Sequence, residues 1–600
     1  MTTSLDPTRY GPDGFRSEAA ALLALIRQQP DVRLARTALF EWVTDHQFDV
    51  NLEDRFQAHR DAILVRDCAR AWRGILRKSA DKRVPPFSVI GALWDIAHDQ
   101  PRPDLEPGFY AEMIHLYRGI EGRASLSTPF QDALDSHLHG REAAEHRSKV
   151  LDGMWARVAA ILERYPDGLS DEARARRAAR RGRILRHFAA SLDEWHDWHW
   201  QVRHITKTEE QLAALAVLDE RERAAVRSAV SAHLPFGVTP YYLSLFDDDP
   251  EVGRDRAVRA QVLPPVGYVR EMEAHHGSRE QAFDFMLEHD TSPIDLVTRR
   301  YPAVAILKPF NTCPQICVYC QRNWEIDEAM SPEALAPPEK LEAACAWIEQ
   351  HPAITEILVT GGDPLALTDV PLERLLRRLA RIESLDLIRI GTRVPVTMPM
   401  RITENFASLL ASLRDPGRRE ICLMTHVEHP YEVTPEFVAA VERLRRQGVA
   451  VYNQLVYTFY VSRRFEAAHL RMLLRRCGVD PYYTFVPKGK EETRSYRVPL
   501  ARLMQEQQEE ARMLPGLRRT DEVVYNVPGL GKNHLRAIQQ RDVVSILPSG
   551  ARIYEFHPWD KQLVKRESYL GTDIPIYEYL SRLAAMGENP DDYSSIWYYF

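Results

Sequence analysis

Residues 311–326 read NTCPQICVYCQRNWEI, and this stretch decides the fold more than any other part of the chain. It places Cys313, Cys317 and Cys320 in a C-x3-C-x2-C spacing directly after the strand-like run 303–310. Thiolates at this density are soft ligands for an iron–sulfur cluster or for zinc. A structural zinc site takes four closed ligands, and no fourth ligand is evident near these three in the sequence. The spacing therefore favours a cluster that leaves one iron open to a further ligand.

From residue 300 onward, strand-like and helix-like runs alternate. The strand-like runs are 303–310, 354–361, 386–394, 420–427, 449–457, 481–486 and 522–527, and helix-like runs between them include 339–350, 372–382 and 435–447. Alternation of strand and helix predicts a parallel sheet with helical crossovers. Seven strand candidates favour a full or partial (β/α) barrel over an open sheet.

The part of the chain before this alternation predicts helix. Residues 17–29 and 143–165 carry apolar side chains at three- and four-residue spacing, which is typical of amphipathic helices. Residues 171–187 contain seven arginines, which favour a solvated helix face or an interdomain salt-bridge surface and otherwise an acidic partner. We divide the chain into a helical N-terminal extension (1–190), a helical entry region (191–299), a barrel (300–535) and a C-terminal segment (536–600).

Composition excludes several classes of protein. The chain has 600 residues, 45% of them hydrophobic, and a formal net charge of −7, so nothing in the whole-chain charge favours nucleic acid or an anionic membrane. No apolar run approaches the ~18 residues of a membrane span, and the first residues lack a signal pattern. Seven cysteines in this length form no disulfide framework. We expect a cytoplasmic protein.

The second strand-like run ends in Thr360-Gly361-Gly362-Asp363-Pro364, where paired glycines let a ligand approach the backbone. Together with Tyr319 as the aromatic residue of C-x3-C-x-aromatic-C, this pattern resembles the radical S-adenosylmethionine (SAM) enzymes. The resemblance implies a 4Fe-4S cluster on the three cysteines, with SAM on the open iron. It also implies that Tyr319, Gly361, Gly362 and Asp363 help to bind the cofactor, the glycine loop holding the methionine amino group.

A narrower resemblance runs from Trp195 to about residue 570. The segments DEWHDWHWQVRHI, TPYYLSL, SPIDLVTRRYP, GTRVPVTMPMRIT and THVEHP follow one another as in the lysine 2,3-aminomutases. The resemblance implies an α/β fold, a partial (β/α)6-type radical SAM barrel, preceded by a mostly α-helical N-terminal extension. It also implies a second cofactor, pyridoxal 5′-phosphate (PLP).

The resemblance assigns further residues to PLP and SAM. Lys532, in the loop Pro528-Gly529-Leu530-Gly531-Lys532, matches the lysine to which the family attaches PLP, although the loop here is one residue shorter than in the lysine enzymes. The other matching cofactor-binding positions are Arg300 and Tyr301 for the PLP phosphate and ring, Gln454 near the cofactor, Arg393 and His426. A second arginine of the family's phosphate motif is replaced by Val304, so other residues must supply part of the contacts to the PLP phosphate.

Three further positions bear on the substrate. Arg322 matches the arginine that clamps the α-carboxylate, for which a bidentate guanidinium is suited. Lysine enzymes hold the distal ammonium with two aspartates, and this chain has Lys488 and Asn526 at those positions. A lysine facing an ammonium is repulsive, whereas a lysine with an amide complements a carboxylate. The exchange resembles glutamate 2,3-aminomutase and predicts L-glutamate as substrate and 3-aminoglutarate as product.

Alternatives remain open at this point. Lys488 lies in a VPKGK turn that is also a natural surface motif, and aspartate is shorter than glutamate by a single methylene. The same chemistry on lysine, aspartate or a natural-product precursor is one alternative, and a non-catalytic iron–sulfur or PLP-binding protein is another. No cysteine follows Cys477, so we expect no cysteine-rich zinc site in the C-terminal tail.

The expected partners follow from the same comparison. The enzyme needs an electron donor of the flavodoxin or ferredoxin type and takes a small amino-acid substrate. We expect a homo-oligomer, with assembly as the role of the N-terminal extension, and no nucleic-acid or membrane partner.

Overall fold

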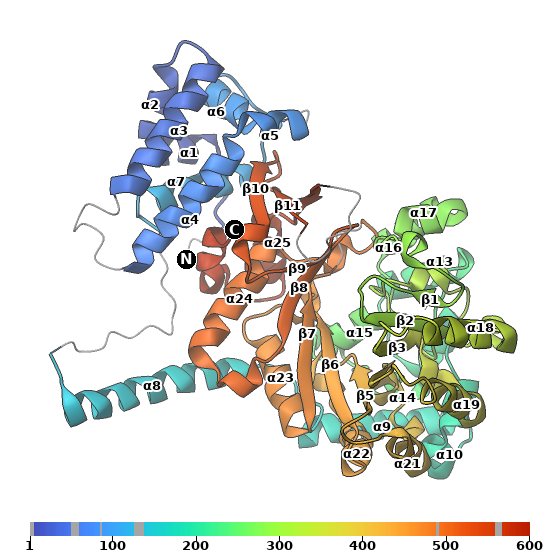
Figure 1. Ribbon diagram of the computed structural model, residues 1–600. Helices are drawn as coiled ribbons and strands as arrows, with labels where there is room; N and C mark the ends of the chain where they lie inside the picture. Colours follow the sequence, from blue (N-terminus) through green and yellow to red (C-terminus); the bar gives the residue numbers. More distant parts are fainter. Residues whose placement is uncertain (1–4, 50–58, 85–86, 125–136, 488–490, 559–566) are drawn as a thin grey trace. The chain divides into compact units, whose positions relative to one another are not determined.

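The computed structural model describes residues 5–49, 59–84, 87–124, 137–487, 491–558 and 567–600. These residues form two compact units, each described here by itself (Figure 1). Unit 1 consists of Met1–Ala160, Arg497–Met513 and Gly529–Phe600, and unit 2 of Ile161–Tyr496 and Leu514–Pro528. The four segments predicted from the sequence follow changes in sequence pattern along the chain, whereas the two units are groups of residues that contact one another in space.

Unit 2 is built on a sheet whose strands follow one another in chain order. The strands are β1 (Val297–Thr298), β2 (Val304–Phe310), β3 (Glu356–Gly361), β4 (Leu387–Gly391), β5 (Glu420–Thr425), β6 (Ala450–Val456), β7 (Val479–Phe485) and β8 (Glu522–Val527). Strand β1 is antiparallel to β2, and β2 to β8 are parallel, with Ile306 opposite Leu358 and Ile390 opposite Leu423. The predicted α/β fold with a parallel sheet, preceded by a helical region, is confirmed.

Helices cover the sheet between successive strands. They are α18 (Pro338–Glu349), α19 (Asp369–Leu379), α20 (Val394–Thr397), α21 (Glu404–Leu413), α22 (Pro435–Arg446) and α23 (Glu466–Arg476). Helix α19 buries Leu372, Leu375, Leu376 and Leu379, which is the three- and four-residue spacing of one helix face. Strands β2 and β6 alternate between fully and partly buried residues, so both faces of the sheet are covered.

A run of mostly short helices precedes the sheet in unit 2. They are α9 (Asp171–His187), α10 (Leu192–His196), α11 (Trp198–Arg203), α12 (Glu209–Leu215), α13 (Glu220–Ser231), α14 (Pro240–Leu243), α15 (Arg256–Val262), α16 (Val266–Ala274) and α17 (Arg279–Phe283). Many begin at a capping side chain: Ser170 accepts from the Ala173 N–H, and Ser191 and Thr208 form capping boxes.

Unit 1 combines helices from the beginning of the chain with helices and a sheet from its end. The first set is α1 (Pro12–Glu18), α2 (Ala20–Arg27), α3 (Val32–Asp49), α4 (His59–Ile75), α5 (Lys78–Arg83), α6 (Val89–Ala97) and α7 (Pro107–Ile120), while α8 (Gly140–Leu162) runs to the boundary of the unit. The second set is α24 (Leu500–Met513), β9 (Gly531–His534), β10 (Arg541–Ile546), β11 (Arg552–Phe556), β12 (Tyr569–Thr572) and α25 (Ile576–Ala585). Strands β10, β11 and β12 form an antiparallel sheet.

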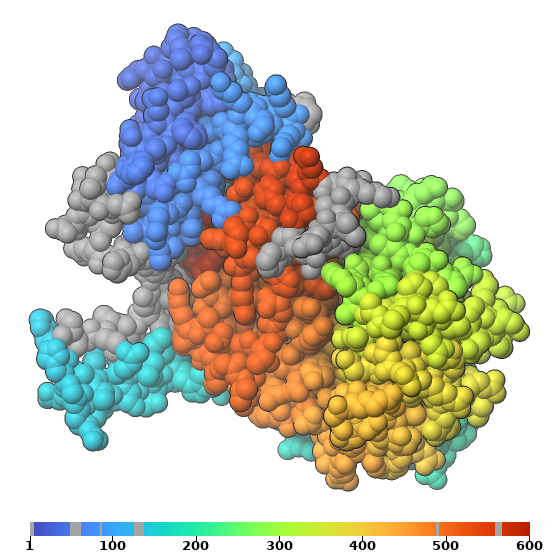
Figure 2. Space-filling model, viewed as in Figure 1, coloured from blue at the N-terminus to red at the C-terminus, as the bar shows by residue number. Residues whose placement is uncertain are grey.

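Polar contacts join the two sets within unit 1. The Glu112 carboxylate on α7 accepts hydrogen bonds from two guanidinium nitrogens of Arg552 on β11, at 3.0 to 3.1 Å. Arg70 on α4 donates to the Asp542 carboxylate on β10 at 2.9 Å. His115 lies between the hydroxyls of Tyr10 and Tyr598. Figure 2 shows the blue N-terminal helices and the orange-red C-terminal strands as one continuous surface. The N-terminal helices therefore share their core with residues from the end of the chain.

Short 3-10 turns connect many of these elements. They are η1 (Pro250–Val252), η2 (His276–Ser278), η3 (His289–Thr291), η4 (Asn323–Glu325), η5 (Pro332–Ala334), η6 (Pro364–Ala366), η7 (Pro399–Arg401), η8 (Pro430–Glu432), η9 (Phe459–Val461), η10 (Arg494–Tyr496), η11 (Gly516–Arg518), η12 (Ile538–Gln540) and η13 (Pro590–Tyr598). Among the helices of the described residues, none combines the length and the apolar character that crossing a membrane requires.

Candidate active site

The cysteine loop follows β2 and is fixed by its own backbone. Cys320 N–H donates to the Cys317 carbonyl at 3.1 Å, and Met330 N–H donates to the Cys313 carbonyl at 3.2 Å. Burial raises the pKa of the Cys313 thiol well above its usual range, helped by Asp363 and the other two thiols. Burial likewise raises the pKa of Cys317 to about 11. The three thiols lie on one short loop, and a bound metal would displace their protons.

The donor set fits an iron–sulfur cluster in its chemistry. No group of three His, Cys, Asp or Glu side chains within the described ranges is placed to hold a single metal ion. A cubane cluster makes a different demand, because each cysteine binds a separate iron atom and the sulfurs need not converge on one point. Three neighbouring thiols on one loop meet that demand.

The Gly361-Gly362-Asp363 loop, which follows β3, packs directly on the cysteine loop. Gly362 N–H donates to the Phe310 carbonyl at 2.8 Å, and Asp363 N–H donates to the Thr312 carbonyl at 2.9 Å. A Cβ atom on Gly362 would lie 2.1 Å from the Thr312 oxygen, and Gly361 has a φ of +112°. Only glycine allows this approach, so the two predicted motifs are brought together as expected.

Asp363 uses its carboxylate to join the ends of two strands. Oδ1 accepts from the Thr392 hydroxyl at 2.6 Å and from the Leu365 N–H at 3.0 Å, and Oδ2 accepts from the Arg393 N–H at 2.8 Å. Burial raises the pKa of this carboxyl. In the structure Asp363 fastens the end of β4 to the glycine loop, and its predicted contact with SAM stays a prediction.

Arg393 is the residue that connects most of the predicted positions. Its Nη1 lies 2.8 Å from Cys317 Sγ, its Nη2 lies 2.6 Å from Glu432 Oε1, and its Nε donates to the His426 carbonyl at 3.2 Å. The guanidinium also lies over the Tyr242 ring at 5.5 Å. A positive charge is thus held against the Cys317 sulfur.

His426 and Gln454 come next along the same edge of the sheet. Burial, together with Arg393, lowers the pKa of His426 to about 4, although a hydrogen bond with the Gln454 backbone opposes that shift. The imidazole is therefore neutral near pH 7. The structure brings Cys317, Asp363, Arg393, His426 and Gln454 into one chain of contacts.

Arg300 and Arg322, predicted for two different anions, meet on one carboxylate. Glu288 Oε1 lies 2.6 Å from Arg322 Nη2 and 3.1 Å from Arg300 Nη2, and Glu288 Oε2 lies 3.3 Å from Lys308 Nζ. Burial opposes ionisation of Glu288, but the three cations outweigh it and lower its pKa. Arg300 Nη2 is buried, and its contact with Glu288 is an ion pair without good hydrogen-bond geometry, so a phosphate oxygen would compete with Glu288 for this nitrogen.

Four predicted positions remain: Tyr319, which belongs to the cysteine loop, and Tyr301, Asn526 and Lys532. The Tyr319 hydroxyl donates to Gln261, and its ring lies 5.7 Å from that of Tyr496. Tyr301 precedes β2, and Asn526 is half-buried on β8. Lys532 is on β9 in unit 1, so its meeting with the residues of unit 2 stays a prediction. Lys488 lies outside the described residues.

Sequence reasoning missed the carboxylates that hold these arginines. Glu288 lies just before η3 and Glu432 ends η8, and neither belongs to a recognised ligand motif. A general signal exists for both, since a buried arginine requires a carboxylate or carbonyl partner. That rule predicts that partners exist without naming them.

Comparison with known proteins shows which family and which relatives this chain resembles. The radical SAM superfamily matches residues 307–461. An uncharacterized KamA family protein of Methanocaldococcus jannaschii is 40% identical over 597 residues, covering 96% of this chain and 95% of that protein. L-lysine 2,3-aminomutase of Bacillus subtilis is 33% identical, covering 52% of this chain and 62% of that protein. Glutamate 2,3-aminomutase of Clostridioides difficile is 30% identical, covering 59% and 78%.

Proposed function

The chain belongs to the KamA family of radical SAM proteins, and we propose that it is a 2,3-aminomutase acting on L-glutamate. The reaction moves the amino group from C2 to C3 and a hydrogen from C3 to C2, so it is an isomerisation without net oxidation. The observation that carries the proposal is the joint placement of Arg300 and Arg322 on Glu288, in the unit that holds the cysteine loop. These are cations for two anionic groups, a cofactor phosphate and a substrate carboxylate.

The family implies a 4Fe-4S cluster and SAM, and PLP by inference from the aminomutases. When bound, the cluster with SAM supplies a radical that takes hydrogen from C3, and PLP supplies the delocalisation that lets the amino group move. Cys313, Cys317 and Cys320 would hold the cluster, while Arg300, Tyr301, Gln454 and Lys532 would hold PLP. Arg393 keeps a positive charge beside Cys317 and favours its thiolate form.

Arg322 supports the assignment of an amino-acid substrate. Its guanidinium is buried and already pairs with Glu288 Oε1 at 2.6 Å and with Glu325 Oε1 at 3.4 Å. A substrate carboxylate would have to compete for one edge of this guanidinium, and a planar group with five donors can serve both partners. Arg322 thereby orients the substrate backbone and leaves the distal end to other residues.

The choice of glutamate rests on the distal positions. Asn526 supplies an amide where a lysine enzyme has a carboxylate, and Lys488 supplies a positive charge at the other position. Removing two negative charges and adding one positive charge favours a distal carboxylate over an ammonium. The proposal also includes a flavodoxin- or ferredoxin-type electron donor and assembly as a homo-oligomer, both on the family resemblance.

The charge exchange can be tested by reversing it. A Lys488→Asp, Asn526→Asp double variant is expected to lose most activity on glutamate and to gain activity on lysine. Lys490→Asp changes the same charge two residues away and serves as the matched control, which is expected to keep the preference for glutamate. Products are identified by proton NMR after anaerobic turnover. Unchanged glutamate activity in the double variant would refute the assignment of the distal residues.

A further inference from the structure

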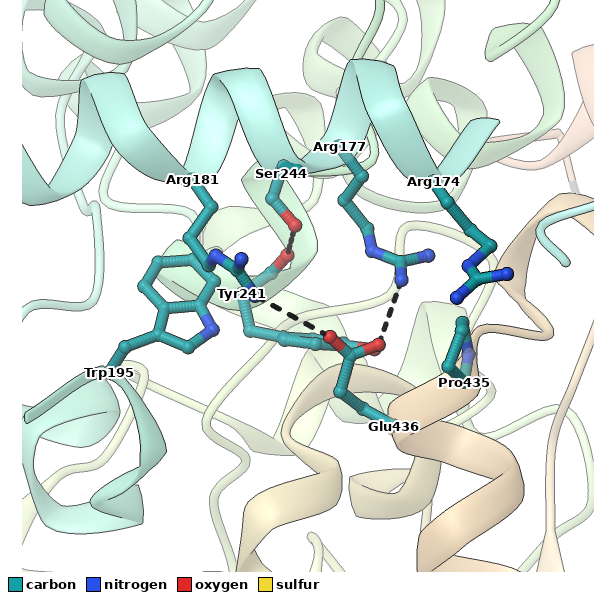
Figure 3. Close-up of a pocket in the computed structure, with 9 residues that line it drawn as sticks. Arg174, Arg177, Arg181, Trp195, Tyr241, Ser244, Pro435 and Glu436 are labelled. Carbon is teal, nitrogen blue, oxygen red and sulfur yellow. Dashed lines mark hydrogen bonds and ion pairs between the residues drawn. The ribbon is translucent and has the colours of Figure 1, made fainter. Parts of the chain in front are cut away.

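A pocket in unit 2 lies between helices that precede the sheet and the start of α22. Its volume is about 280 Å³. Figure 3 shows it between α9, which carries three arginines, and the first residues of α22. The lining residues are Arg174, Arg177, Ala178, Arg181, Trp195, Tyr241, Ser244, Pro435 and Glu436. None of these residues belongs to the candidate active site.

The lining carries an excess of positive charge. Arg174, Arg177 and Arg181 are spaced three and four residues apart on α9, so they share one face of the helix. Glu436 is the single carboxylate among the lining residues; it lies 2.9 Å from Arg177 Nη2 and 3.9 Å from Arg181 Nη1. Arg174 Nη1 also lies 3.3 Å from Asp171 Oδ1 on the same helix, so the three guanidinium groups have two carboxylate partners and one positive charge is in excess.

The pocket also holds a buried donor that has no acceptor. Trp195 is 1% exposed, and its indole N–H has no hydrogen-bond partner in the part of the chain that the structure describes. Figure 3 shows the indole nitrogen on the side of the ring that faces the pocket. The neighbouring hydroxyls are already engaged, because Tyr241 bonds Thr434 at 2.6 Å and Ser244 donates to the Tyr241 carbonyl at 2.6 Å. A buried N–H without a partner is rare and calls for an acceptor atom in the pocket.

We propose that this pocket binds a phosphate dianion, either free or as the phosphate group of a small molecule. A bound anion balances the excess positive charge, and the tetrahedral oxygens of phosphate suit guanidinium forks together with a single N–H donor. Helix α22 adds the positive end of its dipole, since its first residues, Pro435 and Glu436, line the pocket. Trp195 and Tyr241 are buried in its wall, which favours a small ion over the side chains of a docked protein. This site is independent of the proposed aminomutase activity.

Isothermal titration of the full chain with inorganic phosphate tests the proposal. The protein is first loaded with PLP and then desalted, so that the predicted cofactor site is filled and no free PLP competes for the pocket. The unaltered chain is expected to bind phosphate, and an Arg174→Gln, Arg181→Gln double variant is expected to bind it about tenfold more weakly or worse. Arg186→Gln removes the same charge at an exposed position of α9 that does not line the pocket, and its affinity is expected to match that of the unaltered chain.

Two single variants separate binding from a structural role. Trp195→Phe keeps an aromatic side chain but removes the N–H together with the five-membered ring, so phosphate affinity is expected to fall about threefold. Glu436→Gln removes the competing negative charge, so affinity is expected to rise, a gain that damage to the fold would not produce. Circular dichroism shows whether each variant is folded.

The ligand's source and class are decided by parallel titrations. Tighter binding of glycerol phosphate than of inorganic phosphate would indicate a phosphorylated metabolite, and equal binding would indicate free phosphate. The proposal is overturned if the unaltered chain fails to bind phosphate up to about 10 mM, or if all variants bind it equally. Tighter binding of glutarate would also overturn the assignment to phosphate, as would arginine-dependent binding of an acidic protein in place of phosphate.

Discussion

Arg393 shows how one side chain serves both structure and chemistry. Its guanidinium contacts the Cys317 sulfur, a buried carboxylate and a backbone carbonyl, all within 3.2 Å. Glu432 is fully buried, so loss of the arginine charge would leave that carboxylate without its counter-ion. The charge matters as much as the hydrogen bonds.

We expect Arg393→Gln to weaken cluster binding and Arg393→Lys to retain most of it. The neutral side chain removes the charge that lowers the pKa of Cys317, so the thiol gives up its proton less readily. Iron content and cluster absorbance after anaerobic reconstitution measure the effect. Arg389→Gln, four residues earlier on β4 and paired with Glu356, is the control. Equal iron content in the Gln and Lys variants would contradict this role.

Glu466 gives a prediction on pH and stability. Its carboxylate is 1% exposed; burial opposes ionisation, but Arg463 and a hydrogen bond with His429 outweigh burial and lower its pKa to about 2. A lowered folded-state pKa stabilises the protein above the ordinary carboxyl value of 4.5, and that stabilisation is lost as pH falls toward 2. The full effect is about 3 kcal/mol.

Urea unfolding at several pH values measures this contribution. Glu466→Gln is expected to be less stable at pH 6 and to lose less stability than the unaltered chain between pH 4.5 and pH 2. Glu442→Gln breaks an exposed pair with Arg446 and is expected to change stability by less than about 0.5 kcal/mol. Parallel pH profiles for Glu466→Gln and the unaltered chain would contradict the account.

At the residue scale, the motifs name residues of the candidate site but do not name all of the partners that those residues contact. Cys317, Asp363 and Arg393 are named by spacing and resemblance, and the structure joins them. Glu288 is different, because it pairs with Arg322 from 34 residues away on an irregular segment with no periodicity to reveal it. Lys488, on which the substrate assignment depends, lies outside the described residues and stays a prediction.

At the scale of elements, alternation of side chains was a reliable guide to the sheet. The run 522–527 matches β8 residue for residue, and 303–310 matches β2 within one residue. Alternating burial on a covered sheet leaves a clear pattern in sequence. The run 17–29 was less clear, because the structure divides it between α1 and α2 at Ala19.

The contact of the two active-site loops predicts a strong effect of one methyl group. Gly362→Ala would place a carbon 2.1 Å from the Thr312 oxygen, next to Cys313, so one of the two loops must move. We expect this variant to lose most of its cluster after reconstitution. Gly516→Ala is the control, because nothing lies within 4 Å of the added carbon. Normal iron content in Gly362→Ala would show that the close packing of the loops is not needed for the cluster.

At the scale of the whole molecule, the beginning and end of the chain fold into one unit. The sequence suggested a helical extension followed, much later, by a separate C-terminal segment, with assembly as the role of the extension. The pairing of Glu112 with Arg552 spans 440 residues, and no local pattern predicts a contact over that distance. Assembly stays a proposal, whereas completing the core of unit 1 is a role that the structure describes.

The buried pair between these segments should control the stability of unit 1. Glu112 and Arg552 are 1% and 2% exposed; burial opposes the arginine charge, but Glu112 outweighs it and raises the pKa of Arg552. Glu112→Gln leaves that charge without its counter-ion and is expected to lower the free energy of unfolding by about 3–5 kcal/mol. A Glu112→Met, Arg552→Met double variant should recover part of the loss.

Urea unfolding measures this loss, with Asp13→Asn as a control in an exposed pair on α1. That control is expected to change stability by less than about 1 kcal/mol. If Glu112→Gln were as mild as the control, the segments would not depend on this pair.

The central claim is that the chain is a radical aminomutase for glutamate, and product identity tests it most directly. Anaerobically reconstituted protein is given PLP, SAM and dithionite with glutamate, lysine or aspartate in separate reactions, and the products are identified by proton NMR. The account predicts 3-aminoglutarate from glutamate and no isomer from the other two. The 3-amino isomer of lysine or of aspartate would contradict the substrate assignment, and no isomer from any of the three would contradict the proposed activity on glutamate itself.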